Sequence, residues 1–125
     1  MEHRMQWLDR RLIEQIIDGR KTATVRRLEE SVGIDNYNTA LQVGAVYNVY
    51  DAECQSRAAI RLTAVELARW CDLPEKLWRR DPAASGKVCE AAFRADHSDY
   101  FDHPSDDFEF LALYFNPLSL ADPPE

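Results

Sequence analysis

The spacing of the apolar residues changes at Gly19, and this change constrains the fold more than any other feature of the chain. Before it, residues 7–18 show the 3.6-residue period of an amphipathic helix. After it, residues 22–26 alternate like a strand, with Thr22, Thr24 and Arg26 on one face. A glycine between two such segments suits the left-handed turn that ends a helix. The expected buried face of the helix is Leu8, Leu12, Ile13, Ile16 and Ile17.

Lys21 belongs to the turn rather than to the strand. It precedes Thr24 by three residues, so strict alternation would place the two side chains on opposite faces. They share a site only if Lys21 lies in the Gly19-Arg20 turn and its long side chain curls over the end of the strand. No other stretch is so dense in reactive groups, so we expect the remaining polar side chains to converge on Lys21, Thr24 and Arg26.

The rest of the chain predicts a small sheet with helical insertions. Residues 108–115 are apolar on nearly both faces, which indicates a central strand covered on each side. The other expected elements are a long surface loop (28–44), two strands joined by a hairpin (46–51 and 58–65), a short helix (74–78), a second helix (83–97) with Asp81 as its N-cap, and a tail from Asn116. This order predicts an α+β fold, with a small sheet or barrel flanked by helices.

Composition narrows the class of protein. A chain of 125 residues fits one domain, which we expect to span residues 1–118 with a C-terminal tail at 119–125. We find neither an apolar run of about 20 residues nor the apolar region of a signal peptide, so we expect a cytoplasmic protein without a membrane partner. Cys54, Cys71 and Cys89 are odd in number and lack a metal-binding spacing, so we expect buried, reduced thiols. The net charge of −7 favours a small ligand over a polyanion.

The segment Gly19-Arg20-Lys21-Thr22-Ala23-Thr24-Val25-Arg26 resembles the ASCH domain family, a branch of the PUA-like barrels. The mark of that family is a Gly-x-Lys-x-x-x-x-Arg motif after an initial helix. Further matches follow in the order of the family, so the similarity spans about residues 8–118. These matches are Val43-Gly44 before a strand ending at Asp51, Leu77-Trp78, Phe93 with Asp96-His97, Tyr100-Phe101, and the closing strand 108–115.

The resemblance implies a small PUA-like β-barrel with a cleft, a link to RNA or nucleosides, and in some members hydrolysis of N(4)-acetylcytidine by a Lys, a Thr and a Glu. Lys21 carries over as the general base, and Thr24 as the nucleophile or as a hydroxyl that orients water. The Glu has no clean counterpart. Asp81 stands nearest to its place but is one methylene shorter, Ser85-Gly86 offers a competing alignment, and Glu75 is the reserve carboxylate.

Each of these residues also has an ordinary structural interpretation. Asp81 either holds Lys21 or protonates the leaving amine, or is simply a helix cap. Arg26 is either a donor to the substrate or a structural arginine. We expect Arg20, His97 and Tyr100 to contact substrate, although a histidine on an apolar helix face is more often a core residue. We expect no cofactor and no metal, because His97, Asp99, Asp102 and His103 match no ligand spacing.

The leading hypothesis is a metal-free amidohydrolase acting on N(4)-acylated cytosine nucleosides or bases. The first alternative is a non-catalytic RNA-binding module, and the second is a ribonuclease that uses the same cleft. Both would need a basic surface, and the acidic balance of the chain ranks the nucleoside enzyme first. The sequence leaves the oligomeric state open. The basic stripe expected for RNA would consist of Arg10, Arg11, Arg20, Lys21, Arg26 and Arg27.

Overall fold

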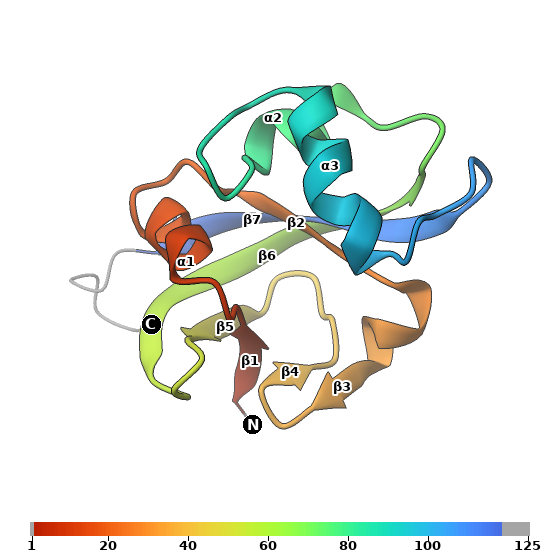
Figure 1. The fold of residues 1–125 in the computed structure, drawn as a ribbon. Coiled ribbons are helices and arrows are strands. Elements are labelled where there is room, and N and C mark those ends of the chain that lie inside the picture. Colours follow the sequence, from red (N-terminus) through yellow and green to blue (C-terminus); the bar gives the residue numbers. More distant parts are fainter. Residues whose placement is uncertain (1, 119–125) are drawn as a thin grey trace.

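Five strands form one curled sheet in the computed structural model, which describes residues 2–118 (Figure 1). The strand order is β1-β5-β6-β7-β2, so β1 and β2 are the two edges. Only the pairing of β1 with β5 is parallel among these ladders. The strands are β1 (His3–Gln6), β2 (Ala23–Arg26), β5 (Val46–Tyr50), β6 (Ser56–Arg69) and β7 (Glu109–Leu118).

Three α-helices cover the sheet and complete the mixed α+β fold that the sequence predicts. α1 (Arg10–Ile17) packs on one side, while α2 (Glu75–Arg80) and α3 (Glu90–Tyr100) lie together on the other (Figure 1). A 3₁₀ turn, η1 (Leu28–Val32), leads into a small hairpin of β3 (Gly33–Asp35) and β4 (Asn38–Thr39). Within the described residues, no helix has the length and apolar character needed to cross a membrane.

The inner strand β7, between β6 and the edge strand β2, separates two hydrophobic cores. Leu113 and Phe115 point into the core under α1, whereas Phe110, Ala112 and Tyr114 point into the core under α2 and α3. Successive side chains of a strand face opposite sides of a sheet, so β7 is buried on both. The prediction of a strand covered on each side is confirmed, and the strand continues past Phe115 to Leu118. Residues 119–125, expected as a tail, lie outside the described residues.

The N-terminal prediction is partly wrong. The helix begins at Arg10 rather than at residue 7, because Asp9 caps it by accepting a hydrogen bond from the Arg11 backbone. The residues before it form β1, which the sequence did not reveal. Leu8 is 74% exposed and Ile17 is 57% exposed, so neither belongs to the core.

The helical insertion also differs from its prediction. No single helix spans 83–97: α2 ends at Arg80, an irregular segment follows, and α3 begins at Glu90 with Cys89 as its N-cap. Asp81 is therefore the C-cap residue of α2 rather than the N-cap of a following helix, and its side chain is free for another role. The loop expected at 28–44 contains η1 and the β3–β4 hairpin. Cys54 and Cys71 are exposed and Cys89 is partly buried, so the prediction of buried thiols is wrong.

Candidate functional site

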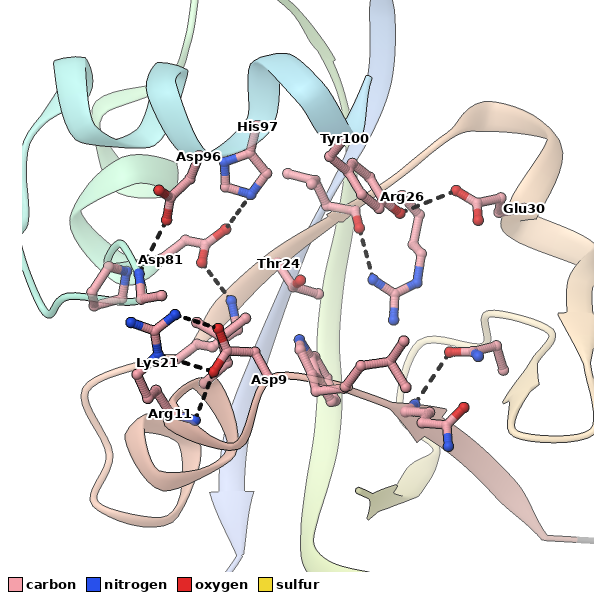
Figure 2. Close-up of a pocket in the computed structure, with 18 of the residues that line it drawn as sticks. Asp9, Arg11, Lys21, Thr24, Arg26, Glu30, Asp81, Asp96, His97 and Tyr100 are labelled. Atoms are coloured by element: carbon pink, nitrogen blue, oxygen red, sulfur yellow. Dashed lines mark hydrogen bonds and ion pairs between the residues drawn. The ribbon is translucent and has the colours of Figure 1, made fainter. Parts of the chain in front are cut away.

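A pocket of about 670 Å³ lies beside the edge strand β2 (Figure 2). A volume of this size suits a small organic ligand. Its walls come from the end of β1, from α1, β2, α3 and the β3–β4 hairpin, and from the segment after α2. The lining residues with polar side chains are Gln6, Asp9, Arg11, Lys21, Thr24, Arg26, Glu30, Asp35, Asn38, Asp81, Asp96, His97 and Tyr100.

Lys21 lies in the turn between α1 and β2, as the sequence predicts. Gly19 adopts a φ of +85°, a left-handed conformation that L side chains disfavour. The backbone N–H of Lys21 donates to the carbonyl of Gln15, which ties the turn to the end of the helix. The Lys21 side chain is only 2% exposed, and its Nζ donates to the Ala23 carbonyl at 3.0 Å and forms an ion pair with Oδ1 of Asp81.

Asp81 is held against β2 by its neighbour Arg80. The Arg80 guanidinium donates to the Thr22 hydroxyl at 2.8 Å and to the Thr22 carbonyl at 3.1 Å. The Thr22 backbone N–H donates back to the Arg80 carbonyl at 2.8 Å. These bonds fix the residue after α2 beside the turn that carries Lys21. The expected partnership of Lys21 with a carboxylate of the helical insertion is therefore present as a contact, and the carboxylate is Asp81.

The second oxygen of Asp81 faces His97. Oδ2 is buried and accepts no hydrogen bond from the described residues, and His97 Nε2 lies 3.5 Å from it. Nδ1 of His97 lies 2.8 Å from the Phe93 carbonyl one helical turn earlier. A carbonyl oxygen only accepts, so Nδ1 carries a hydrogen and Nε2 is the nitrogen turned toward Asp81.

Thr24 lies between two groups of side chains. Figure 2 shows Lys21, Asp81 and His97 on one side of it, and Arg26, Tyr100 and Glu30 on the other. Thr24 is 4% exposed and lines the pocket. A hydroxyl on the wall of the pocket is within reach of a ligand bound there.

Arg26 stands on the same strand face as Thr24. Its Nη1 donates to the Val25 carbonyl at 2.8 Å, and its guanidinium lies over the Trp7 ring at 5.6 Å from the centroid. The remaining guanidinium donors are available at the pocket wall. Across from it, the Tyr100 hydroxyl lies 3.4 Å from Glu30 Oε1, and burial raises the pKa of Tyr100.

Two of the predicted site residues lie elsewhere. Arg20 is half-exposed, pairs with Asp18 at 2.9 Å and does not line the pocket. Glu75 pairs with Arg79 at 2.5 Å on the exposed surface of α2 and also lies away from the pocket. Within residues 2–118, no three His, Cys, Asp or Glu side chains group closely enough to hold a metal ion.

Other residues that line the pocket were not predicted from the sequence. Trp7 is carried by the extension of β1, where its backbone N–H donates to the Tyr50 carbonyl at 3.0 Å. Asp9 and Arg11 form a 2.8 Å ion pair at the pocket mouth, and the Arg11 guanidinium holds the pKa of Asp9 below its usual range. The Asp-x-Arg spacing at the start of the helix was a usable signal for this pair, whereas nothing in the sequence places Trp7 in a pocket.

Residues 3–116 match the profile of the ASCH domain. The chain belongs to the ASCH domain family. This family match covers most of the chain, the Gly-x-Lys motif and the segment from Phe93 to Phe101 included. No curated protein matches it significantly in sequence.

Solved structures show the same fold for this ASCH domain. An ASCH domain from Lactobacillus crispatus has a TM-score of 0.70 at 16% identity, covering 85% of this chain and 69% of that one. A protein from Enterococcus faecalis assigned to the family DUF984 has a TM-score of 0.62 at 19% identity, covering 94% and 82%. A mutant ASCH protein from Zymomonas mobilis has a TM-score of 0.52 at 15% identity, covering 93% and 72%. At such identities the likeness shows the fold, and function must be argued from the site.

Proposed function

We propose that this ASCH domain hydrolyses the amide bond of N(4)-acylated cytosine nucleosides or bases. The observation that carries the proposal is that the buried Lys21–Asp81 pair and Thr24 line the same pocket. A nucleophilic hydroxyl, a base that takes its proton and a third group that orients the base are the parts that amide hydrolysis by covalent catalysis requires.

Each residue then has a separate role. In the form that reacts, Lys21 is a neutral amine, and it removes the proton of the Thr24 hydroxyl while Thr24 Oγ attacks the acyl carbon. Asp81 holds Nζ in place through Oδ1 and balances the charge that Lys21 acquires. Arg26 donates to the pyrimidine carbonyl or to the oxyanion that forms at the acyl carbon. The C–N(4) bond breaks, cytosine leaves, and water hydrolyses the acyl-Thr24 ester.

The arrangement of charges supports a small substrate over RNA. The stripe of basic residues that RNA binding would use is not free to act as one surface. Lys21 and Arg26 are buried, and Arg11 and Arg20 are paired with Asp9 and Asp18. A polyanion gains affinity by neutralising its phosphates with accessible cations, and here four of the six cations of that stripe are buried or paired.

The direct test mixes the purified protein with N(4)-acetylcytidine and follows cytidine release by chromatography. Thr24→Val and Lys21→Met should each lower kcat/KM by about 100-fold or more, because each removes a group that acts in the transition state. Thr63→Val is the matched control. Thr63 lies in β6, where its hydroxyl donates to the Tyr114 carbonyl of β7, and it does not line the pocket, so activity should stay close to that of the wild type.

The proposal is overturned if the wild type releases no cytidine or if Thr24→Val turns over normally. Mass spectrometry of the peptide that carries Thr24, after rapid acid quenching, separates the two roles left open for this residue. An acetylated Thr24 identifies the nucleophile, whereas an unmodified one under steady turnover indicates that Thr24 orients water. Cleavage of RNA without cytidine release would instead indicate a ribonuclease.

A further inference from the structure

The proposed reaction still lacks a proton donor for its leaving group. Breaking the C–N(4) bond without protonation would release a strongly basic nitrogen anion, so the exocyclic nitrogen must receive a proton as it departs. Lys21 cannot supply this proton at that stage, because its proposed role is to remove the proton of the Thr24 hydroxyl. Asp81 already uses Oδ1 to hold Lys21.

His97 lies where such a donor is required. It lines the same pocket, its side chain is 16% exposed, and its Nε2 is 3.5 Å from the buried Oδ2 of Asp81. Asp81 as a residue is 2% exposed, and its Oδ2 is buried and accepts no hydrogen bond from the described residues. An unpartnered carboxylate oxygen in a dry site is costly, so this position favours a donor on Nε2.

The ring of His97 is fixed so that only one nitrogen can exchange protons. Nδ1 is occupied by its bond to the Phe93 carbonyl, and the imidazole stacks on the Phe93 ring with 4.1 Å between centroids. The Tyr100 ring packs edge-on to the imidazole, with 6.4 Å between the ring centroids. A histidine that only filled the core would need no carboxylate at its second nitrogen, and this one faces both Asp81 and the pocket.

We infer that His97 delivers the proton to the leaving cytosine amine, and that Asp81 serves Lys21 and His97 as a shared counter-ion. The inference rests on the proposed function. The resting site holds the ion pair of Lys21 and Asp81. In the form that reacts, the proton of this pair lies on His97 instead, so that Lys21 is a neutral amine and His97 an imidazolium, with the carboxylate of Asp81 between them. During acylation, the Thr24 hydroxyl proton passes to Lys21 and the Nε2 proton passes to N(4). The C–N(4) bond breaks, the acyl-Thr24 ester forms, and the site keeps its net charge.

The second half of the reaction restores the starting state. Neutral His97 takes a proton from the water that attacks the acyl-Thr24 ester. Lys21, now an ammonium, returns its proton to Thr24 Oγ as the ester bond breaks and the carboxylic acid leaves. Oδ1 of Asp81 stabilises the charge when it lies on Lys21, and Oδ2 stabilises it when it lies on His97. No metal, cofactor or redox step is needed for the balance.

The test compares His97→Ala with wild type on two substrates, N(4)-acetylcytidine and its 5-fluoro derivative. The fluorine withdraws electrons and makes the amine easier to expel without a proton donor. We expect a loss in kcat/KM of about 100-fold or more on N(4)-acetylcytidine and a loss at least several-fold smaller on the 5-fluoro substrate. Added imidazole should restore part of the activity of His97→Ala, because the vacated space opens onto the pocket.

The matched control is His103→Ala. His103 is 77% exposed, lies 3.8 Å from the carboxylate of Asp99, and does not line the pocket. Its removal should leave both substrates unaffected. Equal losses on both substrates without imidazole rescue, in a His97→Ala protein with wild-type circular dichroism, would reduce His97 to a packing residue and overturn the inference alone. Near-normal activity of His97→Ala would overturn it as well. An inactive wild type would overturn the proposed function and the inference together.

Discussion

Lys21 and Asp81 carry opposite charges at the same buried point, each with a side chain only 2% exposed. Such a pair adds little to stability, because the cost of removing two charges from water offsets their attraction. Loss of one partner is a different matter, since the other is then left charged and unpaired in the interior. The pair is therefore better explained by chemistry than by stability.

This argument predicts distinct stabilities for single and double variants. Lys21→Met and Asp81→Leu should each lower the free energy of unfolding by about 3–5 kcal/mol, because each leaves one buried charge. The double variant should recover most of that loss and still be inactive. Chemical denaturation measures the first effect and cytidine release the second.

The control for this prediction is an exposed pair. Lys76 and Glu66 lie 2.8 Å apart with side chains 54% and 42% exposed, so Lys76→Met should cost at most about 1 kcal/mol. A double variant of Lys21 and Asp81 as unstable as its worse single parent would contradict the argument. In that case the residues would support the fold independently of each other.

The sequence pointed to several residues that line the pocket but missed others at its rim. Lys21 and Thr24 follow from a local motif, and the alternation rule was sufficient to place Lys21 in the turn. Asp81 came from the resemblance, although local signals favoured a helix cap before Pro82. Arg20 fits the motif as well as its neighbours do, yet its ion pair with the exposed Asp18 keeps its side chain outside the pocket. One-dimensional spacing cannot tell which of two adjacent basic residues points inward.

At the scale of elements, Glu2 fastens the N-terminal strand to the sheet. Its carboxylate accepts hydrogen bonds from the Tyr50 hydroxyl and the Asn48 amide of β5, and from Arg4 of β1. These bonds, with the one from Tyr50 contributing most, lower the pKa of Glu2 from 4.5 to about 2. The charged form is thus the one that the folded state favours.

This shift predicts how stability depends on pH. A carboxylate whose pKa falls on folding stabilises the fold fully above its unfolded pKa, and this contribution is lost as pH falls through the folded value. For Glu2 that window runs from about 4.5 down to about 2. Glu2→Gln should therefore flatten the acid limb of the unfolding free energy in this window. Identical acid limbs for variant and wild type would contradict the assignment.

The elements that sequence predicted well are those with strong local patterns. β7 is apolar on both faces, and α1 ends at a glycine, so local rules sufficed for both. β1 was missed because its four residues, His3–Gln6, have no apolar alternation and become a strand only by parallel pairing with β5, more than forty residues away. The helix predicted at 83–97 failed because Asp81-Pro82 imitates a helix start, while the carboxylate is committed to Lys21.

At the scale of the whole molecule, charge selects among ligands. The chain carries a net charge of −7, and the pocket lining contains Asp9, Glu30, Asp35, Asp81 and Asp96 against Arg11, Lys21 and Arg26. A ligand that brings further negative charge meets an unfavourable potential there. An uncharged nucleoside or free base does not.

We therefore expect a preference of about tenfold or more in kcat/KM for N(4)-acetylcytidine over its 5′-monophosphate at low salt. The double variant Glu30→Gln with Asp35→Asn, on the η1 and β3 side of the pocket, should narrow that preference. Raising the ionic strength should narrow it further, because salt screens exposed charges. Equal rates for the two substrates at low salt would count against charge selection.

The ladder between β2 and β7 joins residues made at very different times. Thr24 is paired with Leu113, 89 positions later in the chain. At ribosomal rates of about 5–20 residues per second, the motif strand is finished several seconds before its partner exists. Every proposed catalytic side chain lies before β7 begins at Glu109. A nascent chain stopped at that point would contain every proposed catalytic residue but would lack the strand that pairs with β2. Activity would therefore appear only when β7 is complete.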